Sequence, residues 1–250
     1  MIKIRDLHKQ FGEKKVLNGV TLDIERGLTT TIFGVSGGGK STIIKHIVGL
    51  LKADKGEILV DGINVITASE KEMMQIRHKV GFLFQSGALF DSMNVLENVA
   101  FPLVEHTKLS KKEIFSRVEA KLELVGLKPK EVLHLFPHEL SGGMRKRVGL
   151  ARTIVSEPES ILYDEPTSGL DPITSDLISQ MIIKLKNELK VTSVLISHDM
   201  NESFKCSDKI AMLHNGKIVE YGTCEEIKNS KNPVVRQFIE GSSEGPIQLN

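Results

Sequence analysis

The sequence contains no tryptophan, two tyrosines and only two cysteines among its 250 residues. Cys206 and Cys224 form neither a C-x-x-C pair nor a disulfide framework, so a reducing compartment is expected. No run of about 20 uncharged apolar residues occurs, so no membrane-spanning helix is expected. The N-terminal residues 1–5 lack the apolar stretch of a signal peptide.

An excess of charge of either sign is also missing. The 33 basic and 32 acidic residues leave a formal net charge of +1, so a strongly basic nucleic-acid-binding protein is not expected. Hydrophobic residues make up 40% of the chain and charged residues 26%, which argues against a mostly disordered protein. The length fits one large domain, or a core with small appended parts.

Apolar strands alternate with helical patterns along the chain, which predicts an α/β core. Ser69 and Ser110 are each followed three residues later by glutamate, the pattern of a capping box, which predicts that a helix begins after each serine. Asn215-Gly216 between two apolar runs predicts a hairpin with a two-residue turn. Residues of about 86–156 are predicted to form a mainly helical subdomain inserted into the sheet domain. Strands are predicted at 20–24, 29–33, 57–60, 81–84, 161–163 and 191–197, and helices at 41–51, 69–78, 114–125 and 178–189.

Residues 34–41 read Gly-Val-Ser-Gly-Gly-Gly-Lys-Ser and fit the phosphate-loop pattern G-x-x-x-x-G-K-[ST]. Lys40 is predicted to neutralise the β- and γ-phosphates of a nucleotide, and the Ser41 hydroxyl to ligate Mg²⁺. A flexible glycine turn is the alternative, which the apolar strand before the loop and the helix after it disfavour. The predicted nucleotide-binding residues here are Gly34, Ser36, Gly37, Gly38, Gly39, Lys40, Ser41 and Thr42.

Two carboxylates, Asp164 and Glu165, directly follow the apolar run 161–163. A strand that ends in this way places them at the carboxyl edge of a parallel sheet, where ligands bind. Asp164 is predicted to hold Mg²⁺, usually through water, and Glu165 to orient and deprotonate an attacking water. The alternative is a strand end that merely faces solvent. A carboxylate beside the Mg²⁺ ligand suits hydrolysis better than transfer to a hydroxyl acceptor.

The run Leu140-Ser141-Gly142-Gly143-Met144 resembles the signature motif of ATP-binding cassette (ABC) ATPases, commonly Leu-Ser-Gly-Gly-Gln. Further marks of this family follow in chain order, over roughly residues 1 to 225. The resemblance implies that Phe11 stacks on adenine and that Gln85 senses Mg²⁺ and contacts a transport subunit. It also implies that Asp171 belongs to the D-loop and that His198 contacts the γ-phosphate. Each has a plainer alternative: a core aromatic at Phe11, a strand cap at Gln85 and a carbonyl-bound ring at His198.

The resemblance implies the fold of a P-loop NTPase with a RecA-like core, an N-terminal antiparallel β subdomain and an inserted helical subdomain. Residues 1–229 would be the ATP-binding domain and residues 230–250 a short C-terminal tail. Two copies would face each other head to tail, each ATP lying between Lys40 of one copy and Ser141, Gly142 and Gly143 of the other. Met144 departs from the family pattern by removing an amide, although hydrolysis is expected to survive.

Residues 85–90, 94–103, 140–152 and 235–246 resemble the ATPase subunit of Mla-type phospholipid transporters, which pair with mammalian-cell-entry (MCE) domain proteins. The implied partners are a second copy, a membrane permease, an MCE-domain lipid-binding protein and a small STAS-domain regulator, with no nucleic acid. The implied location is the cytoplasmic face of the inner membrane.

Other functions compete with lipid transport. The same ATPase could serve another cargo, such as amino acids, lipoproteins or drugs. A soluble ABC ATPase acting on ribosomes or DNA usually carries two nucleotide sites or a long coiled coil in one chain. This chain has a single phosphate loop and no sustained heptads, which disfavours that function. A P-loop GTPase is disfavoured because no Asn-Lys-x-Asp motif occurs.

Three stretches have two interpretations each. Residues 88–90, Ala-Leu-Phe, are either ordinary core or the apolar edge of a groove that receives a permease helix. The basic run 145–147 is predicted to coat the solvent face of its helix, rather than to bind a phosphate or a lipid headgroup. The apolar stripe of the tail either docks on its own domain or contacts another chain, and the Mla-type resemblance favours the second ATPase copy or the regulator. The stripe consists of Val234, Val235, Phe238 and Ile239.

Overall fold

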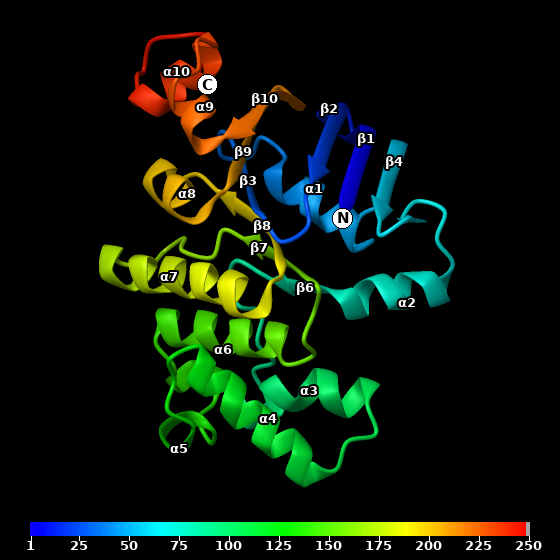
Figure 1. Cartoon of the computed structure of the whole chain (residues 1–250), viewed down its shortest axis with the longest axis vertical. Coiled ribbons are helices and arrows are strands. Elements are labelled where there is room, and N and C mark those ends of the chain that lie inside the picture. The colour runs from blue at the N-terminus through cyan, green and yellow to red at the C-terminus, as the bar shows by residue number, and fades with distance from the viewer. Residues whose placement is uncertain (249–250) are drawn as a thin grey trace.

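The computed structural model describes residues 1–248, which form two β-sheets flanked by helices (Figure 1). The larger sheet has six strands in the order β10-β9-β3-β8-β7-β6. The strands from β9 to β6 in that order run parallel, whereas β10 pairs antiparallel with β9. The bounds are β3 (Thr29–Phe33), β6 (Val80–Leu83), β7 (Ser160–Asp164), β8 (Thr192–Ser197), β9 (Lys209–His214) and β10 (Lys217–Thr223).

The smaller sheet is antiparallel, with strand order β2-β1-β4-β5. Alternate residues of β1 and β2 are buried, the pattern of a strand with one face on a core. The sequence pattern predicts the second strand over residues 20–24 but not the first, because a bulge with Asp6 at φ of 46° places two residues between the buried Ile4 and Leu7. The bounds are β1 (Ile2–Phe11), β2 (Lys14–Ile24), β4 (Lys55–Val60) and β5 (Ile63–Asn64).

The predicted helices are present, but two of them differ in extent. The helix predicted over residues 178–189 is α7 (Pro172–Leu189) and begins earlier, because Asp171 caps its N-terminus and proline suits the first helical position. Both capping boxes are present at the starts of α2 (Glu70–Lys79) and α4 (Lys111–Leu124). The helix predicted over residues 41–51 is α1 (Lys40–Ile47) and ends earlier. Gly49 adopts a left-handed conformation with φ of 67°, and the Leu50 N–H turns back to the Lys45 carbonyl at 2.9 Å, which terminates the helix.

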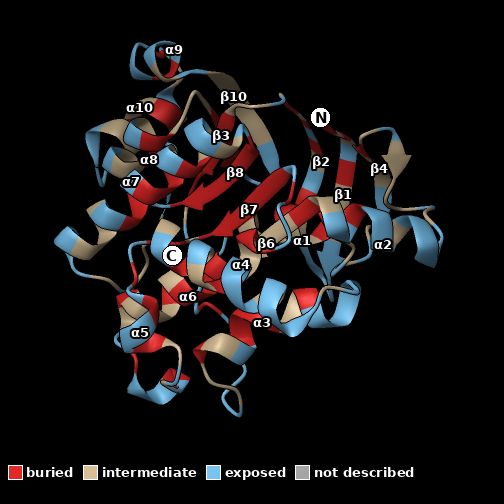
Figure 2. Cartoon of the chain, turned by 60° about the horizontal axis from the view of Figure 1, so that its bottom comes forward, coloured by how far each residue is buried: buried red, intermediate tan, exposed pale blue. Residues whose placement is uncertain are grey.

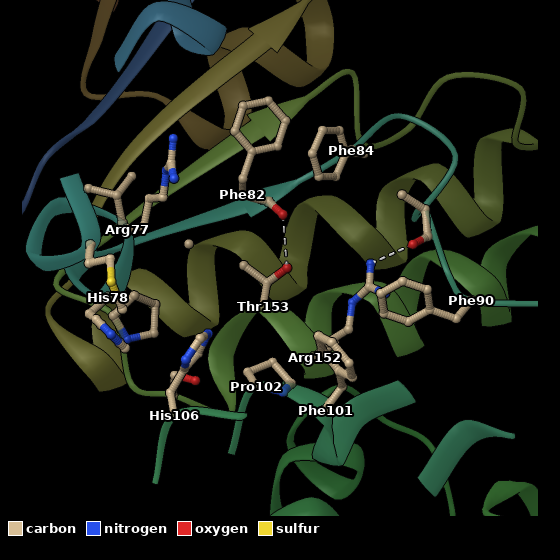
Figure 3. A pocket seen from close by; sticks show the side chains of 16 residues that line it. Arg77, His78, Phe82, Phe84, Phe90, Phe101, Pro102, His106, Arg152 and Thr153 are labelled. Carbon is tan, nitrogen blue, oxygen red and sulfur yellow. Dashed lines mark hydrogen bonds between the residues drawn. The ribbon is translucent and has the colours of Figure 1, made fainter. Parts of the chain in front are cut away.

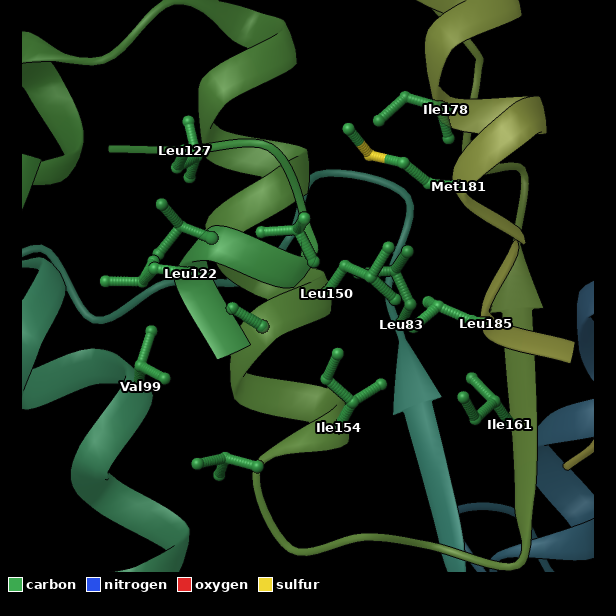
Figure 4. Packing of buried hydrophobic residues seen from close by; sticks show 14 of the residues in the cluster. Leu83, Val99, Leu122, Leu127, Leu150, Ile154, Ile161, Ile178, Met181 and Leu185 are labelled. Atoms are coloured by element: carbon green, nitrogen blue, oxygen red, sulfur yellow. The ribbon is translucent and has the colours of Figure 1, made fainter. Parts of the chain in front are cut away.

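A group of helices is inserted between β6 and β7 and forms the lower part of Figure 1. Its inward-facing leucine, isoleucine and valine side chains pack against β6, β7 and α7 (Pro172–Leu189), as Figure 4 shows. This arrangement confirms the predicted α/β class, the N-terminal antiparallel sheet and the helical insertion. The inserted elements are α3 (Val95–His106), α4, α5 (Pro129–Val132), a 3₁₀ turn (Pro137–Glu139) and α6 (Gly142–Ile154).

Buried residues concentrate on the strands of the larger sheet and on the helix faces turned toward it (Figure 2). Strands β3, β7 and β8 are buried along their whole lengths, as expected for parallel strands covered on both faces. The described helices, within residues 1–248, include none with the length and apolar character needed to cross a membrane. The Asn215-Gly216 turn between β9 and β10 is confirmed, since both residues have positive φ, as a type I′ turn requires.

The C-terminal residues pack on their own domain. Beyond α8 (Met200–Cys206), helices α9 (Cys224–Lys228) and α10 (Pro233–Glu240) lie side by side at the top of Figure 1, and α10 joins an apolar cluster with β3 and β9. The Phe238 ring meets the Phe33 ring edge to face at 4.6 Å between centroids, and Val235 is buried. Gln237 holds residues after the helix through two hydrogen bonds with the Ile247 backbone, at 2.7 and 3.0 Å. The apolar stripe therefore packs on its own domain, the first of its two interpretations. Val234, Phe238 and Ile239 stay half-buried, and their contact with another chain stays a prediction.

This packing predicts that Phe238→Ala destabilises the protein by about 2–3 kcal/mol, because it uncovers Phe33 and leaves a cavity. The measurement is the free energy of unfolding from a denaturant titration. Phe115→Ala is the matched control, since Phe115 is 40% exposed on α4 and should change stability by less than about 0.5 kcal/mol. Equal effects of the two substitutions would contradict the cis docking of α10.

Candidate functional site

Four neighbouring parallel strands deliver the predicted site residues to one edge of the larger sheet. The phosphate loop follows β3, His198 follows β8, Asp164 ends β7, and Gln85 lies just beyond β6. These strands are adjacent in the order β3-β8-β7-β6, and their carboxyl ends lie at the same edge. Residues more than 100 positions apart in the chain therefore meet there.

The phosphate loop presents free N–H groups at the start of α1. Gly39 precedes this helix with φ of 99°, and no side chain caps the helix N-terminus. A side chain at residue 39 would also approach Val16 Cγ1 to 2.8 Å, so only glycine fits beneath β2. Because the first N–H groups of a helix lack internal partners and carry partial positive charge, the loop can bind an anion.

Lys40 lies folded over the loop and nearly buried. Its Nζ donates hydrogen bonds to the carbonyl oxygens of Gly34 and Val35, at 2.8 and 2.9 Å. Burial lowers the pKa of Lys40, while the carboxylates of Glu165 and Asp164 act in the opposite direction. The ammonium therefore lies between the loop and the acidic pair, where a phosphate would meet it.

Ser41 and Asp164 are in direct contact. Ser41 Oγ donates to Asp164 Oδ1 at 2.5 Å, although the two residues are 123 positions apart. A hydroxyl and a carboxylate are the hard oxygen donors that Mg²⁺ prefers. Both residues predicted as metal ligands are thus together, at the start of α1 and the end of β7.

Glu165 is the point on which two other predicted residues converge. Its Oε2 accepts a hydrogen bond from Gln85 Nε2 at 3.2 Å and lies 3.5 Å from His198 Nδ1. The backbone of Glu165 is left-handed, with φ of 48°, and its N–H donates to the Ile196 carbonyl at 3.1 Å. The carboxylate therefore projects from a sharp turn after β7, within reach of the two side chains from β6 and β8.

The remaining predicted residues lie apart from this cluster. Phe11 is 47% exposed at the end of β1, which excludes the core-aromatic alternative. Ser141 caps α6 by accepting from the Met144 N–H at 3.2 Å, and Gly142 and Gly143 form the first turn. Asp171 caps α7 through the N–H groups of Ile173 and Thr174. In the described part of the chain, no hydrogen bond joins Phe11, Ser141, Gly142, Gly143 or Asp171 to residues 34–41.

The prediction that the basic run 145–147 coats a solvent face is wrong. All three side chains turn back to backbone carbonyl oxygens: Arg145 to Leu140, Lys146 to Ser168 and Arg147 to Gly126. Lys146 is only 6% exposed. Its position among the buried residues Gly143 and Leu150, at helical spacing, was the signal available in the sequence.

Comparison with known proteins defines the class. Residues 17–168 match the family model described as ABC transporter. The chain belongs to this family: it is an ATP-binding and ATP-hydrolysing subunit of the kind that drives transport. Its fold matches the solved dimer of a bacterial ABC transporter cassette with a TM-score of 0.83 and 33% identity, over 90% of this chain and 99% of that one. The dimeric post-hydrolysis state of a cassette bound to ADP and phosphate matches with a TM-score of 0.82, 33% identity and the same coverage.

Curated relatives cover essentially the whole chain. The probable ribonucleotide transport ATP-binding protein mkl of Mycobacterium leprae is 45% identical over 249 residues, 100% of this chain and 71% of that protein. The intermembrane phospholipid transport system ATP-binding protein MlaF of Escherichia coli K12 is 41% identical over 247 residues, 99% of this chain and 91% of that protein. MlaF of Haemophilus influenzae is 39% identical over 249 residues, 100% of this chain and 94% of that protein.

The convergence on Glu165 predicts that Glu165→Gln separates nucleotide binding from hydrolysis. The amide keeps the shape of the side chain but cannot take a proton, so kcat should fall at least about 100-fold while ATP still binds. Steady-state hydrolysis and nucleotide titration measure the two effects. Glu159→Gln is the control, because Glu159 lies before the opposite end of β7. Hydrolysis by Glu165→Gln at the wild-type rate would rule out this carboxylate as the base.

Proposed function

We propose that this chain powers the transport of phospholipids between membranes, as the ATPase subunit of an Mla-type ABC transporter. The ATPase part of the proposal rests on one observation: Lys40, Ser41, Asp164 and Glu165 meet at one edge of the sheet. The cargo is argued from the relatives.

The proposed roles follow from the donors and acceptors that each side chain presents. Lys40 exchanges its loop carbonyls for phosphate oxygens, and the uncapped N–H groups of α1 bind the same anion. Ser41 and Asp164, with Gln85 nearby, would hold Mg²⁺, which supplies charge neutralisation at the β- and γ-phosphates. Glu165 accepts the proton of the attacking water. His198 contacts the γ-phosphate and loses that contact when the phosphate leaves, since its ring lies beside Glu165, the proposed base.

The signature residues are proposed to serve the nucleotide of a second copy. Ser141 caps α6, and Gly142 and Gly143 form its first turn. The cap occupies the Met144 N–H, whereas the N–H groups of Gly142 and Gly143 are not bonded to their own phosphate loop and can serve another ligand. Placing this helix N-terminus against the γ-phosphate completes the shell of donors around a tetra-anion. The solved relatives that are dimers support this arrangement.

A groove between the sheet and the inserted helices is the proposed seat of the permease. It has a volume of about 540 Å³ and is lined by aromatic side chains from β6, from residues 84–90 and from α3 (Figure 3). The Phe90 and Phe101 rings lie 4.9 Å apart, and Phe90 is 41% exposed. Arg152 fixes the groove wall by donating to the Gly87 and Ala88 carbonyl oxygens, each at 2.8 Å.

Residues 88–90 were predicted to be either ordinary core or the edge of a groove, and each interpretation fits part of the segment. Ala88 and Phe90 line the groove, whereas Leu89 packs against the core of the helical insertion. The segment begins directly at Gln85, which bonds the proposed base. A permease helix seated in the groove would therefore act on the hydrolytic site through the backbone of residues 85–90.

Residues 1–229 are proposed as the ATP-binding domain, with a helical subdomain at about 86–156 and a tail at 230–250. The proposed further partners are an MCE-domain lipid-binding protein and a small STAS-domain regulator, at the cytoplasmic face of the inner membrane. Phospholipid cargo is supported by the names of the MlaF relatives, at 39–41% identity over nearly their whole lengths. Ribonucleotide transport is the second candidate, because the mkl relative at 45% identity carries that name.

Purification of the native complex through a tag on this chain tests the cargo. We expect a permease and an MCE-domain protein to co-purify, and mass spectrometry to find phospholipid enriched over an unrelated ABC complex prepared in the same detergent. Enrichment of ribonucleotide in place of lipid supports the second candidate. A complex with neither an MCE-domain protein nor enriched lipid contradicts the proposal.

If each nucleotide site is shared between two copies, the rate of ATP hydrolysis by a mixed dimer should depend on whether two substitutions lie in the same copy or in different copies. In a mixed dimer with Lys40→Ala in one copy and Ser141→Arg in the other, one composite site carries both changes and the other is intact. With both changes in the same copy, each composite site is damaged once, and hydrolysis should fall to background. Two affinity tags isolate the two mixed dimers. Equal rates, or the reverse order, contradict composite sites.

A further inference from the structure

The three cations of the run 145–147 differ in where their partners lie. Arg145 and Arg147 bond the carbonyl oxygens of Leu140 and Gly126, which belong to the helical insertion itself. Lys146 instead reaches out of the insertion to Ser168, in the loop between β7 and α7. It is the direct polar link from the signature helix to the segment that carries the proposed base.

Lys146 Nζ donates to the Ser168 carbonyl oxygen at 2.6 Å and lies 3.4 Å from the Glu165 carbonyl oxygen. The Ser168 hydroxyl and N–H both point to that same Glu165 carbonyl, at 3.0 and 3.2 Å. The lysine thus closes the turn from residue 165 to residue 168 from the side of α6. Burial lowers the pKa of Lys146 to about 8, against the pull of the Glu165 and Glu202 carboxylates. A buried cation is costly, so a plain packing role would favour an apolar residue here.

The backbone that Lys146 holds is strained. Glu165 has φ of 48°, a left-handed conformation that is unfavourable for a residue with a side chain. Its carboxylate must nevertheless point toward Gln85 and His198 to act on water. Rotation about the Glu165 N–Cα bond to a negative φ would release the strain, and it would move the carboxylate and the Glu165 carbonyl oxygen together. The ammonium opposes that rotation because it attracts the carbonyl oxygens of Glu165 and Ser168 in their present directions.

We infer that Lys146 is a positioning residue for hydrolysis. Its ammonium fixes the turn 165–168 and thereby couples the orientation of the Glu165 carboxylate to the position of α6, the helix that begins at the signature motif. The inference rests on the proposed role of Glu165 as the base. It adds a second route between the helical insertion and the hydrolytic site, separate from the route through Gln85. Displacement of α6 would withdraw the ammonium and loosen the base.

Lys146→Met tests the inference in the full-length protein, because methionine keeps much of the volume and removes the donor and the charge. We expect kcat for ATP hydrolysis to fall about 10-fold or more, while KM for ATP changes less than about 3-fold. Lys146→Arg keeps a charged donor and should hydrolyse ATP at least about 3-fold faster than Lys146→Met. The glutamine side chain of Lys146→Gln is too short to reach Ser168, so this variant should show the same fall in kcat as Lys146→Met. It takes the place of Lys146→Met in the test if the methionine variant does not fold.

Arg147→Met is the matched control. Arg147 lies next to Lys146 and also donates to a carbonyl oxygen, at 3.0 Å, but that oxygen belongs to Gly126 in the helical insertion. This variant should melt at a lower temperature and keep kcat. An unchanged kcat in Lys146→Met and Lys146→Gln overturns the inference. An equal loss of kcat in Arg147→Met, or a methionine variant as active as the arginine variant, overturns it too.

Glu165→Gln separates this inference from the proposed function. If Glu165→Gln keeps turnover, the assignment of the base fails, whatever the Lys146 variants do. If Glu165→Gln loses turnover and Lys146→Met keeps it, only the positioning role fails.

Discussion

The contact between Ser41 Oγ and Asp164 Oδ1 expresses the constraint on which the rest of the structure depends. It requires the carboxyl ends of β3 and β7 to be level, although β8 lies between them. Parallel pairing of β3 with β8 and of β8 with β7 supplies that alignment, and the crossover helices keep the strands parallel. A register shift in either pairing would separate the hydroxyl from the carboxylate, because one residue of strand is about 3.3 Å.

Around this contact, the end of each strand carries a different kind of chemical group. The loop after β3 supplies positive charge and N–H groups, whereas β7 supplies carboxylates. Gln85 and His198 come from the strands on either side of β7 and meet at one oxygen of Glu165. A change at either flanking strand therefore reaches the same carboxylate. The helical insertion reaches it as well, through Lys146 at the turn that follows.

Local sequence patterns predicted most of the elements, because each such pattern is satisfied within a few residues. The capping boxes at Ser69 and Ser110 and the turn at Asn215 are of this kind. The site was predictable for the same reason, since its motifs lie at strand ends whose edge is fixed by parallel pairing. The failures concern long-range partners. The spacing of Lys146 from Gly143 and Leu150 indicates that it is buried, but its acceptor, the Ser168 carbonyl, belongs to a distant loop and has no signature in the sequence.

The docking of the tail on its own domain was not predictable for a related reason: an apolar stripe in the sequence does not show which surface covers it. That surface includes Phe33, at the end of β3, which Phe238 covers. The order of synthesis gives this contact a further consequence. β3 is made early, but its neighbours β8 and β9 emerge about 160 residues or more later. At about 5–20 residues per second, that strand lacks both pairing partners for on the order of 10 s or longer. Phe33 stays uncovered for longer still, until α10 has been synthesised, so the growing chain exposes an unpaired strand and an apolar ring to association during that time.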